Sequence, residues 1–242
     1  MDVIGPGGEK IDSMEAWAGL YASPRSAHQW KEHRSAYSVA EFILNRNGGA
    51  ALQTRVSEAL AEPVEFERAH PEMEVRFDQF GRGRMHDLGI FGRTASGKSL
   101  FVGVEAKVDE PFGALVREAY LGTKARQITG ESTNAPERIE QLLKLHFREP
   151  DPSMFEVRYQ LLYATAGTLA ASADISVLYV IVFKTPAYSE TIAAENYRDY
   201  AQFMAKTGAH PVKLPNKEAT AHKLLLGGKE LLCLYEYFEF YS

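Results

Sequence analysis

The sequence of 242 residues has only one cysteine, Cys233, so it cannot build an internal disulfide framework. Long hydrophobic runs are also missing, because the longest, residues 177–183, is far too short to cross a bilayer. Residues 1–10 are polar and rich in glycine, unlike a secretory signal peptide. These absences fit a reducing compartment, and we expect a cytoplasmic protein with no membrane role.

Positive charge is not in excess, since 27 Lys and Arg stand against 32 Asp and Glu, a net charge of −5. Proteins that coat nucleic acid without specificity are usually basic, so the balance disfavours that class but permits an enzyme with a local basic cleft. Hydrophobic residues make up 45% of the chain and charged residues 24%, as in ordinary globular proteins. The length suits one domain with a sizeable core.

Helical and strand patterns alternate along the chain, after a loosely docked arm over residues 1–12. Ser153 and Glu156 resemble a capping box at the start of one helix, and residues 47–49 resemble a helix stop. Between residues 123 and 150 the sequence is polar, with helical stretches. The expected helices cover 13–20, 35–46, 50–60, about 113–120, 153–172 and 196–206, and the expected strands lie in 63–80, 87–91, 100–108, 176–184, 224–226 and 231–235. This order predicts an α/β fold with a mixed sheet covered on both faces.

Residues 92–99, GRTASGKS, match the phosphate-binding pattern G-x-x-x-x-G-K-[ST] letter for letter. That mechanism requires a helix directly after the loop, because the helix amides and dipole bind the phosphate. Here the next residues, LFVGV, have the pattern of a strand. We therefore interpret the segment as a hairpin turn and not as a nucleotide site.

The strongest chemical signal combines Asp87, Glu105 and Lys107. Glu105 and Lys107 lie two residues apart on an expected strand, so their side chains share one face. The rest of that strand is apolar, and charged groups in such a strand need partners. Asp87 begins the preceding strand, and the residues between it and Glu105 are enough for a hairpin. Such a hairpin could bring both carboxylates to one end of the sheet. A purely structural Glu–Lys pair is the alternative.

Two carboxylates offer hard oxygen ligands suited to Mg²⁺ or Mn²⁺, with water and substrate phosphate completing the shell. The ion would polarise a phosphoryl group and lower the pKa of a bound water. Lys107 could orient that water or neutralise the developing charge.

The D…E-x-K spacing resembles the signature of the PD-(D/E)XK nuclease superfamily. The wider pattern is similar to an uncharacterised bacterial family placed in that superfamily, over roughly residues 30–170. The matching pieces are Trp30-Lys31, Arg34-Ser35-Ala36-Tyr37, Asp87-Leu88, Val104-Glu105, Lys107-Val108-Asp109-Glu110-Pro111-Phe112-Gly113, Arg158-Tyr159-Gln160-Leu161-Leu162 and Thr165-Ala166.

This resemblance implies a restriction-endonuclease-like core, with a mixed central sheet flanked by helices, over roughly residues 35–185 of a single domain, 1–242. Residues 1–34 would add an arm and a short helix, and residues 186–242 a helix and a hairpin. It also implies that Asp87, Glu105 and the carbonyl of Ala106 bind the metal, that Lys107 is the catalytic lysine, and that Gln160 is a polar helper.

Several further residues carry weaker predictions. Glu41 could add to the metal shell, as an acid on the first helix does in some members, although it does not align cleanly. Arg158 could contact phosphate, and Trp30 with Lys31 could stack on a base or bind the backbone. The structural alternative for Gln160 is a helix cap or a core hydrogen bond, and for Trp30 it is an anchor of the irregular segment around it. Asp109 is a weaker candidate ligand, His86 is expected to be a neighbour of the site, and the basic residues Arg82, Arg84, Lys124 and Arg126 could bind phosphates if they converge.

The sequence therefore predicts a Mg²⁺-dependent phosphodiester hydrolase that acts on DNA and could form a homodimer. The alternative is a non-catalytic interaction module that keeps the nuclease fold, which the acidic balance favours.

Overall fold

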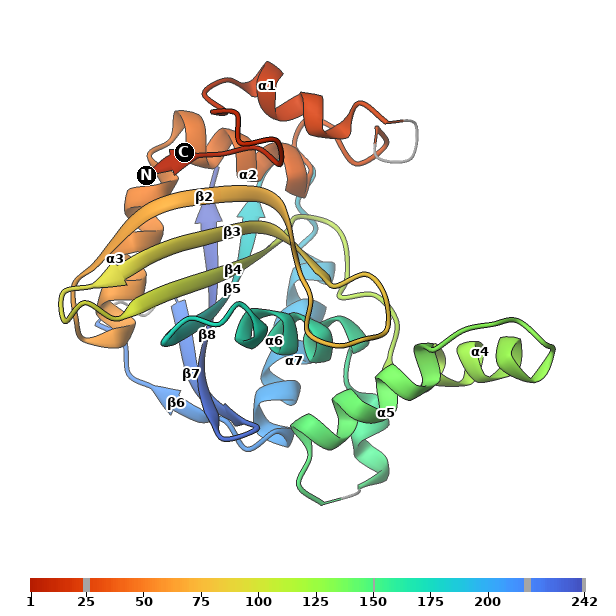
Figure 1. The fold of residues 1–242 in the computed structure, drawn as a ribbon. Coiled ribbons are helices and arrows are strands. Elements are labelled where there is room, and N and C mark those ends of the chain that lie inside the picture. Colours follow the sequence, from red (N-terminus) through yellow and green to blue (C-terminus); the bar gives the residue numbers. More distant parts are fainter. Residues whose placement is uncertain (24–26, 150, 216–218, 241–242) are drawn as a thin grey trace.

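The computed structural model describes residues 1–23, 27–149, 151–215 and 219–240 (Figure 1). Its centre is one eight-stranded mixed sheet in the order β1-β2-β3-β4-β5-β8-β7-β6. The strands are β1 (Asp2–Val3), β2 (Val64–Val75), β3 (Arg84–Thr94), β4 (Ser99–Lys107), β5 (Ile175–Lys184), β6 (His210–Val212), β7 (Ala219–Leu226) and β8 (Lys229–Glu239). The α/β fold expected from the sequence is confirmed.

Strand direction divides the sheet into two antiparallel wings around a parallel centre. β2, β3 and β4 form an antiparallel meander, whereas β4, β5 and β8 run parallel to one another. Beyond β8 the sheet continues with β7 and then β6, and each of these pairs is antiparallel. The hairpin predicted around Gly227 and Gly228 is confirmed, and its second strand lies inside the sheet, beside β5.

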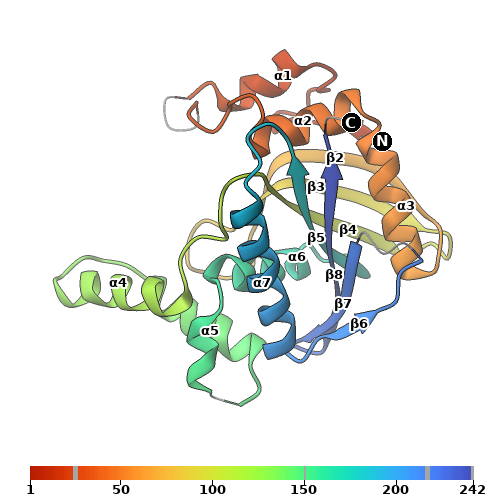
Figure 2. The same cartoon turned by 180° about the vertical axis from the view of Figure 1, so that it is seen from behind.

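Helices cover both faces of the sheet, as Figures 1 and 2 show. The α-helices are α1 (Met14–Ala18), α2 (Ser35–Asn45), α3 (Gly48–Leu60), α4 (Val116–Ile128), α5 (Ala135–His146), α6 (Tyr159–Ala170) and α7 (Glu190–Lys206), with 3₁₀ turns at Gly19–Tyr21 and Pro152–Glu156. α2 and α3 pack on one face, and α6 lies across the other beside α7. Among the described residues, no helix is both long and apolar enough to cross a membrane.

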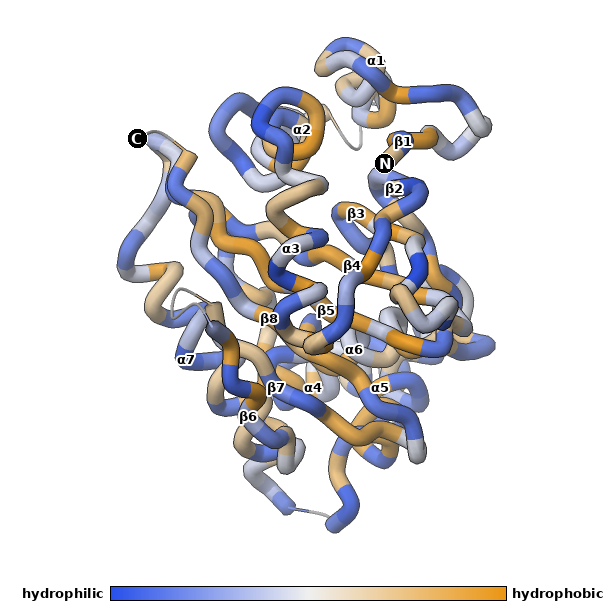
Figure 3. Tube along the Cα trace, turned by 90° about the vertical axis from the view of Figure 1, so that its left-hand side faces the viewer, coloured by the Kyte–Doolittle hydropathy of each residue, from blue (hydrophilic) through white to orange (hydrophobic). Residues whose placement is uncertain are grey.

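The central strands are apolar because both of their faces are buried. In β5, every residue from Ser176 to Phe183 is buried, and in β4 every residue from Leu100 to Lys107 is buried. Continuous apolar runs are typical of strands with helices on both sides. The hydrophobic colour along β4, β5 and β8 in Figure 3 follows the same pattern. Glu105 and Lys107 are therefore charged residues set into the most hydrophobic layer of the molecule.

α4 and α5 form a helical hairpin that extends away from the body of the fold in both views (Figures 1 and 2). Its exposed side carries two large hydrophobic residues, Leu121 and Ile128. The polar region after residue 123 thus belongs to α4 and α5. The helix expected to end near residue 120 continues to Ile128.

The segment that matches the nucleotide-binding pattern is a hairpin turn, as predicted. β3 ends at Thr94 and β4 begins at Ser99, so the following residues form a strand and not a helix. The Thr94 carbonyl accepts a hydrogen bond from the Gly97 amide at 2.9 Å, and Gly97 has a φ of +82°. Glycine adopts this left-handed conformation without the steric cost that a side chain would add.

Three local predictions were wrong. The first residues are not a loose arm: Asp2–Val3 pair with β2, and Val3 and Ile11 are buried. The helix after the predicted stop begins at Gly48 and not at Ala50, so only Asn47 of the three stop residues, in a left-handed conformation, lies outside a helix. Ser153 does not begin a long helix, because the turn Pro152–Glu156 is 3₁₀ and capped by Asp151, and α6 starts later, at Tyr159.

Candidate metal centre

The candidate site lies where β3 and β4 stop pairing. The ladder between these strands runs from Arg93 and Ser99 to Leu88 and Val104. Asp87 is the next residue of β3, and its carboxylate accepts a hydrogen bond from the backbone amide of Ala106 at 2.6 Å. The divergence of the strands thus lets a side chain take the place of a ladder partner, and it brings Asp87 beside the E-x-K segment.

Glu105, Lys107 and Gln160 form a connected cluster under α6. The Lys107 ammonium lies 2.9 Å from Glu105 Oε1 and donates to Gln160 Oε1 at 3.2 Å. The Gln160 amide nitrogen donates in turn to Glu105 Oε1. Gln160 stands in the first turn of α6 and therefore holds both charged residues of β4. The structure thus brings Asp87, Glu105, Lys107 and Gln160 into one region, as the sequence predicted, while their roles stay predictions.

Burial sets the protonation behaviour of these groups. Glu105 and Lys107 are almost fully buried, and Asp87 is partly buried. Loss of water raises the pKa of the Asp87 carboxyl, while the charges of Lys107 and Arg84 oppose that rise. Burial lowers the pKa of the Lys107 ammonium, while Asp87 and Glu110 oppose that fall. For both groups the effect of burial on the pKa is larger than that of the opposite charges, so each ionised form is less favoured here than in water.

Arg84, at the start of β3, is part of the same cluster. Its guanidinium forms an ion pair with Glu105 Oε2 and lies over the ring of Tyr163, 4.9 Å from the ring centre. The sequence had grouped Arg84 with three other basic residues that could converge on the site. Lys124 and Arg126 do not converge on it, because they lie on α4, where they contact Gln127 and Glu131, and Arg82 is exposed.

Glu72 is a residue of this region that the sequence did not reveal. The register of β2 and β3 places it level with Asp87. Its φ is +49°, an unfavourable conformation for glutamate, and such strain often accompanies a functional site. The Tyr21 hydroxyl donates to its carboxylate. Burial, with a contribution from the charge of Asp87, raises the pKa of Glu72 to about 7. Neither strand register nor a positive φ at a non-glycine residue can be inferred from residue type.

The predicted accessory residues have other partners. Arg158 forms ion pairs with Asp199 and Glu195 of α7, at 2.7 and 2.5 Å, and donates to the Gly113 carbonyl. Glu41 forms an ion pair with Arg46 at 2.9 Å. These ion pairs account for the placement of both side chains, and neither residue contacts Glu105 or Asp87 through them.

Trp30, Asp109 and His86 also have structural roles. Trp30 stacks on Tyr21, with ring centres 5.3 Å apart, and thereby supports the residue that holds Glu72, while its neighbour Lys31 is exposed. Asp109 lies beyond the end of β4 and forms an ion pair with Arg34 at 2.9 Å. His86 is buried against Phe101, and burial lowers the pKa of its ring to about 3. A ring buried in this way stays neutral.

The comparison with protein families gives one result. A family model described as Domain of unknown function (DUF6946) matches residues 10–235. The chain belongs to the DUF6946 family. No curated protein and no solved structure matches it. The DUF6946 match includes strands β2 to β7 and most of β8. It also includes Asp87, Glu105, Lys107 and Gln160.

Asp87, Glu105 and the Ala106 carbonyl are the groups of this DUF6946 chain that could hold a metal. Within the described ranges, no three Asp, Glu, His or Cys side chains are grouped closely enough to form a metal site by themselves. Two carboxylates nevertheless fit Mg²⁺, which is usually bound through one or two carboxylates and keeps several waters. The oxygen donors therefore suit this ion, although both Glu105 oxygens already contact positive or hydrogen-bonding groups.

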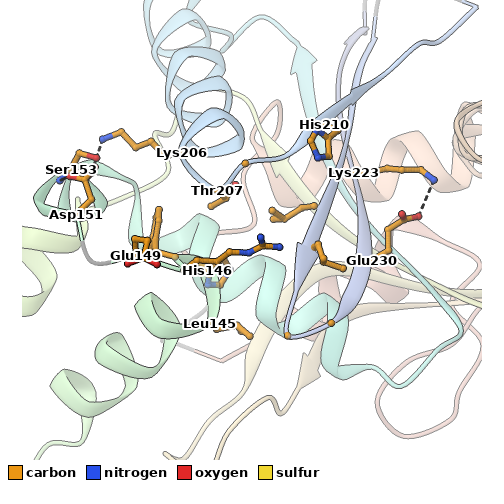
Figure 4. Close-up of a pocket in the computed structure, with 17 residues that line it drawn as sticks. Leu145, His146, Glu149, Asp151, Ser153, Lys206, Thr207, His210, Lys223 and Glu230 are labelled. Carbon is orange, nitrogen blue, oxygen red and sulfur yellow. Dashed lines mark hydrogen bonds and ion pairs between the residues drawn. The ribbon is translucent and has the colours of Figure 1, made fainter.

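A cavity with a volume of about 820 Å³ lies elsewhere, between α5, α7 and the β7–β8 hairpin (Figure 4). Its lysines are already engaged: Lys206 donates to the Ser153 carbonyl at 2.6 Å, and Lys223 lies 2.9 Å from Glu230. None of the residues of the metal-type cluster lines this cavity. The candidate metal centre on β3 and β4 is therefore separate from this cavity.

Proposed function

We propose that the protein is a Mg²⁺-dependent phosphodiester hydrolase of the PD-(D/E)XK type that acts on DNA. The observation that supports this most is the hydrogen bonding of Gln160 to both Glu105 and Lys107, with Asp87 anchored on the intervening residue, Ala106. A structural Glu–Lys pair would need neither the amide of a separate helix nor a second carboxylate. The choice of DNA rests on the resemblance to the superfamily.

In this proposal Asp87 and Glu105 hold the ion, with the Ala106 carbonyl as a third oxygen. Bound Mg²⁺ supplies positive charge to the phosphoryl oxygens and makes a bound water more acidic. The Lys107 ammonium orients the attacking water or stabilises negative charge that develops on the phosphoryl group. Gln160 fixes the position of that ammonium. Because the amide of Ala106 binds Asp87, the carboxylate is fixed before any ligand arrives.

The first test is calorimetric titration of Mg²⁺ and Mn²⁺ into the wild type and into an Asp87→Ala/Glu105→Ala variant. We expect binding to the wild type that the double variant loses. Glu67→Gln, which removes an exposed acid paired with Arg93, is the control and should bind as the wild type does. Equal binding by all three proteins would rule out the assigned ligands.

Cleavage is tested separately on labelled single-stranded and double-stranded DNA. Lys107→Met should reduce cleavage by at least about a hundredfold, the usual scale for one group that stabilises charge, while metal binding persists. Undiminished cleavage by Lys107→Met would contradict the role of Lys107.

A second function is favoured by one specific observation. Arg84, Glu105 and Lys107 are all almost fully buried, and both cations pair with the one carboxylate, as in a site whose charges only hold the fold together. The chain would then be a non-catalytic interaction module. Affinity for duplex DNA that falls steeply with salt favours the hydrolase, because released counterions drive phosphate binding. Indifference to nucleic acid favours the module.

A further inference from the structure

Arg84 is a buried cation that lies on the carboxylate a metal ion would need. Only 8% of its side chain is exposed, and its guanidinium pairs with Glu105 Oε2. The other oxygen of Glu105 already has Lys107 and the Gln160 amide as partners. Glu105 is therefore surrounded by an amide donor and two cations, so two positive charges face its single negative charge.

Arg84 also has capacity left for another acceptor. A guanidinium carries five N–H donors in a planar fork, which matches two oxygens of a phosphate. The Nε of Arg84 is buried and has no hydrogen-bond partner. The ring of Tyr163 supports one face of the guanidinium, so the group can shift its donors while it remains stacked.

The charge balance of the candidate metal centre indicates that a cation and an anionic ligand bind there together. Arg84 and Lys107 carry two positive charges, and Asp87 and Glu105 carry two negative charges, so the four side chains are neutral as a set. A divalent cation alone would leave them with two excess positive charges in a poorly solvated region, which is unfavourable. An anionic phosphodiester that arrives with the cation offsets one of those two charges.

We propose that Arg84 is the phosphate-binding residue of the site and that it occupies Glu105 until the phosphodiester is bound. When the guanidinium moves from the carboxylate to the phosphate, Glu105 becomes free to accept the cation. Metal and substrate therefore bind cooperatively. This inference rests on the proposed function, because it uses Asp87 and Glu105 as the metal ligands.

The decisive experiment measures Mn²⁺ affinity by calorimetry, with and without a DNA oligonucleotide whose phosphorothioate linkages resist cleavage. In the wild type we expect the oligonucleotide to raise Mn²⁺ affinity by about tenfold or more, and by reciprocity Mn²⁺ to raise oligonucleotide affinity equally. Absence of this coupling in a wild type that binds Mn²⁺ overturns the proposal for Arg84 but leaves the proposed metal site intact.

Arg84→Met provides the second arm. Without the competing guanidinium, Mn²⁺ alone should bind at least about fivefold more tightly, while the oligonucleotide binds more weakly and the coupling shrinks. Arg138→Met is a matched control, because Arg138 also pairs with one acid, Asp78, and lies over a ring, Phe77, but contacts neither Glu105 nor Asp87. It should change neither affinity.

The outcomes separate the two proposals. Unchanged or weaker Mn²⁺ binding by Arg84→Met, in a variant with native circular dichroism, overturns the role of Arg84 alone. If neither the wild type nor Arg84→Met binds Mn²⁺ with or without the oligonucleotide, the metal site itself is wrong and both proposals fail. Because the wild-type coupling needs no substitution, the test remains decisive even if Arg84→Met does not fold.

Discussion

Several ionisable side chains of this protein lie in poorly solvated places. Glu72 is the clearest case, since its carboxyl is buried beside Asp87 and held by the Tyr21 hydroxyl. Its pKa of about 7 means that the folded protein keeps the proton at pH values where the unfolded chain, with a carboxyl pKa of 4.5, has released it. Ionised Glu72 is therefore a destabilising group.

Glu72→Gln tests this conclusion in the metal-free protein. Between pH 4.5 and about 7 the unfolded wild type releases a proton that the folded state retains, so its stability falls as the pH rises. The loss is about 3 kcal/mol once the pH exceeds 7. We expect the variant to be more stable than the wild type at pH 8 and to lose that advantage at pH 4.5, as measured by urea unfolding. An advantage that does not change with pH would contradict the assigned pKa.

The residue scale also shows what the sequence could reveal about the site. Asp87, Glu105 and Lys107 were predictable because two spacings and one strand period determine their placement. Gln160 could be named only through the resemblance, since nothing local links a helix residue to β4. Arg84 was named only as one of four basic residues that could converge on the site, and Glu72 was not named at all. Their positions depend on strand register and on an unusual backbone conformation, and both are tertiary properties.

At the scale of elements, ion pairs connect segments that would otherwise meet only through apolar contacts. Arg158 precedes α6 and binds Asp199 and Glu195 of α7 together with the Gly113 carbonyl before α4. One side chain thus connects three segments at the end of α6 that carries Gln160. The sequence predicted strands better than helix starts: β4 and β5 are continuous apolar runs, whereas the start predicted at Ser153 lies inside a 3₁₀ turn that Asp151 caps.

Arg158→Met should destabilise the fold without abolishing metal binding. The substitution leaves Asp199 half-buried without its partner, at a cost of about 2 kcal/mol, between the values for surface and fully buried pairs. Thermal unfolding should then shift down by about 4–8 °C. Mn²⁺ affinity should remain that of the wild type. A variant of unchanged stability whose affinity for DNA is reduced would instead support a direct phosphate contact by Arg158.

At the scale of the whole molecule, the burial of neutral histidines contributes to the loss of folding stability at acidic pH. His146, near the end of α5, is enclosed on the α6 face, with Nδ1 2.7 Å from the Leu142 carbonyl and Nε2 2.6 Å from the Thr165 hydroxyl. Burial lowers the pKa of its ring from 6.5 to about 4. The folded state therefore resists a proton that the unfolded chain accepts.

The contribution of His146 to stability is complete above pH 6.5 and decreases as the pH falls toward about 4, because only the unfolded state gains the proton in that range. The decrease is about 3 kcal/mol. His146→Gln should be less stable than the wild type at pH 7.5, and the difference should shrink by about this amount at pH 4. Urea midpoints across this range measure it. A difference independent of pH would show that the ring accepts a proton as readily in the folded protein as in the unfolded chain.

β8 has a consequence for the order in which the molecule can assemble. It pairs directly with β5, yet it follows β5 by about 45 residues, with α7, β6 and β7 in between. Until those residues have been synthesised, the most apolar strand of the chain has an unpaired edge, and such edges invite pairing with other chains. Interruption of synthesis before β8 would thus leave an aggregation-prone intermediate, and the pairing of β5 with β8 would be a late and slow step.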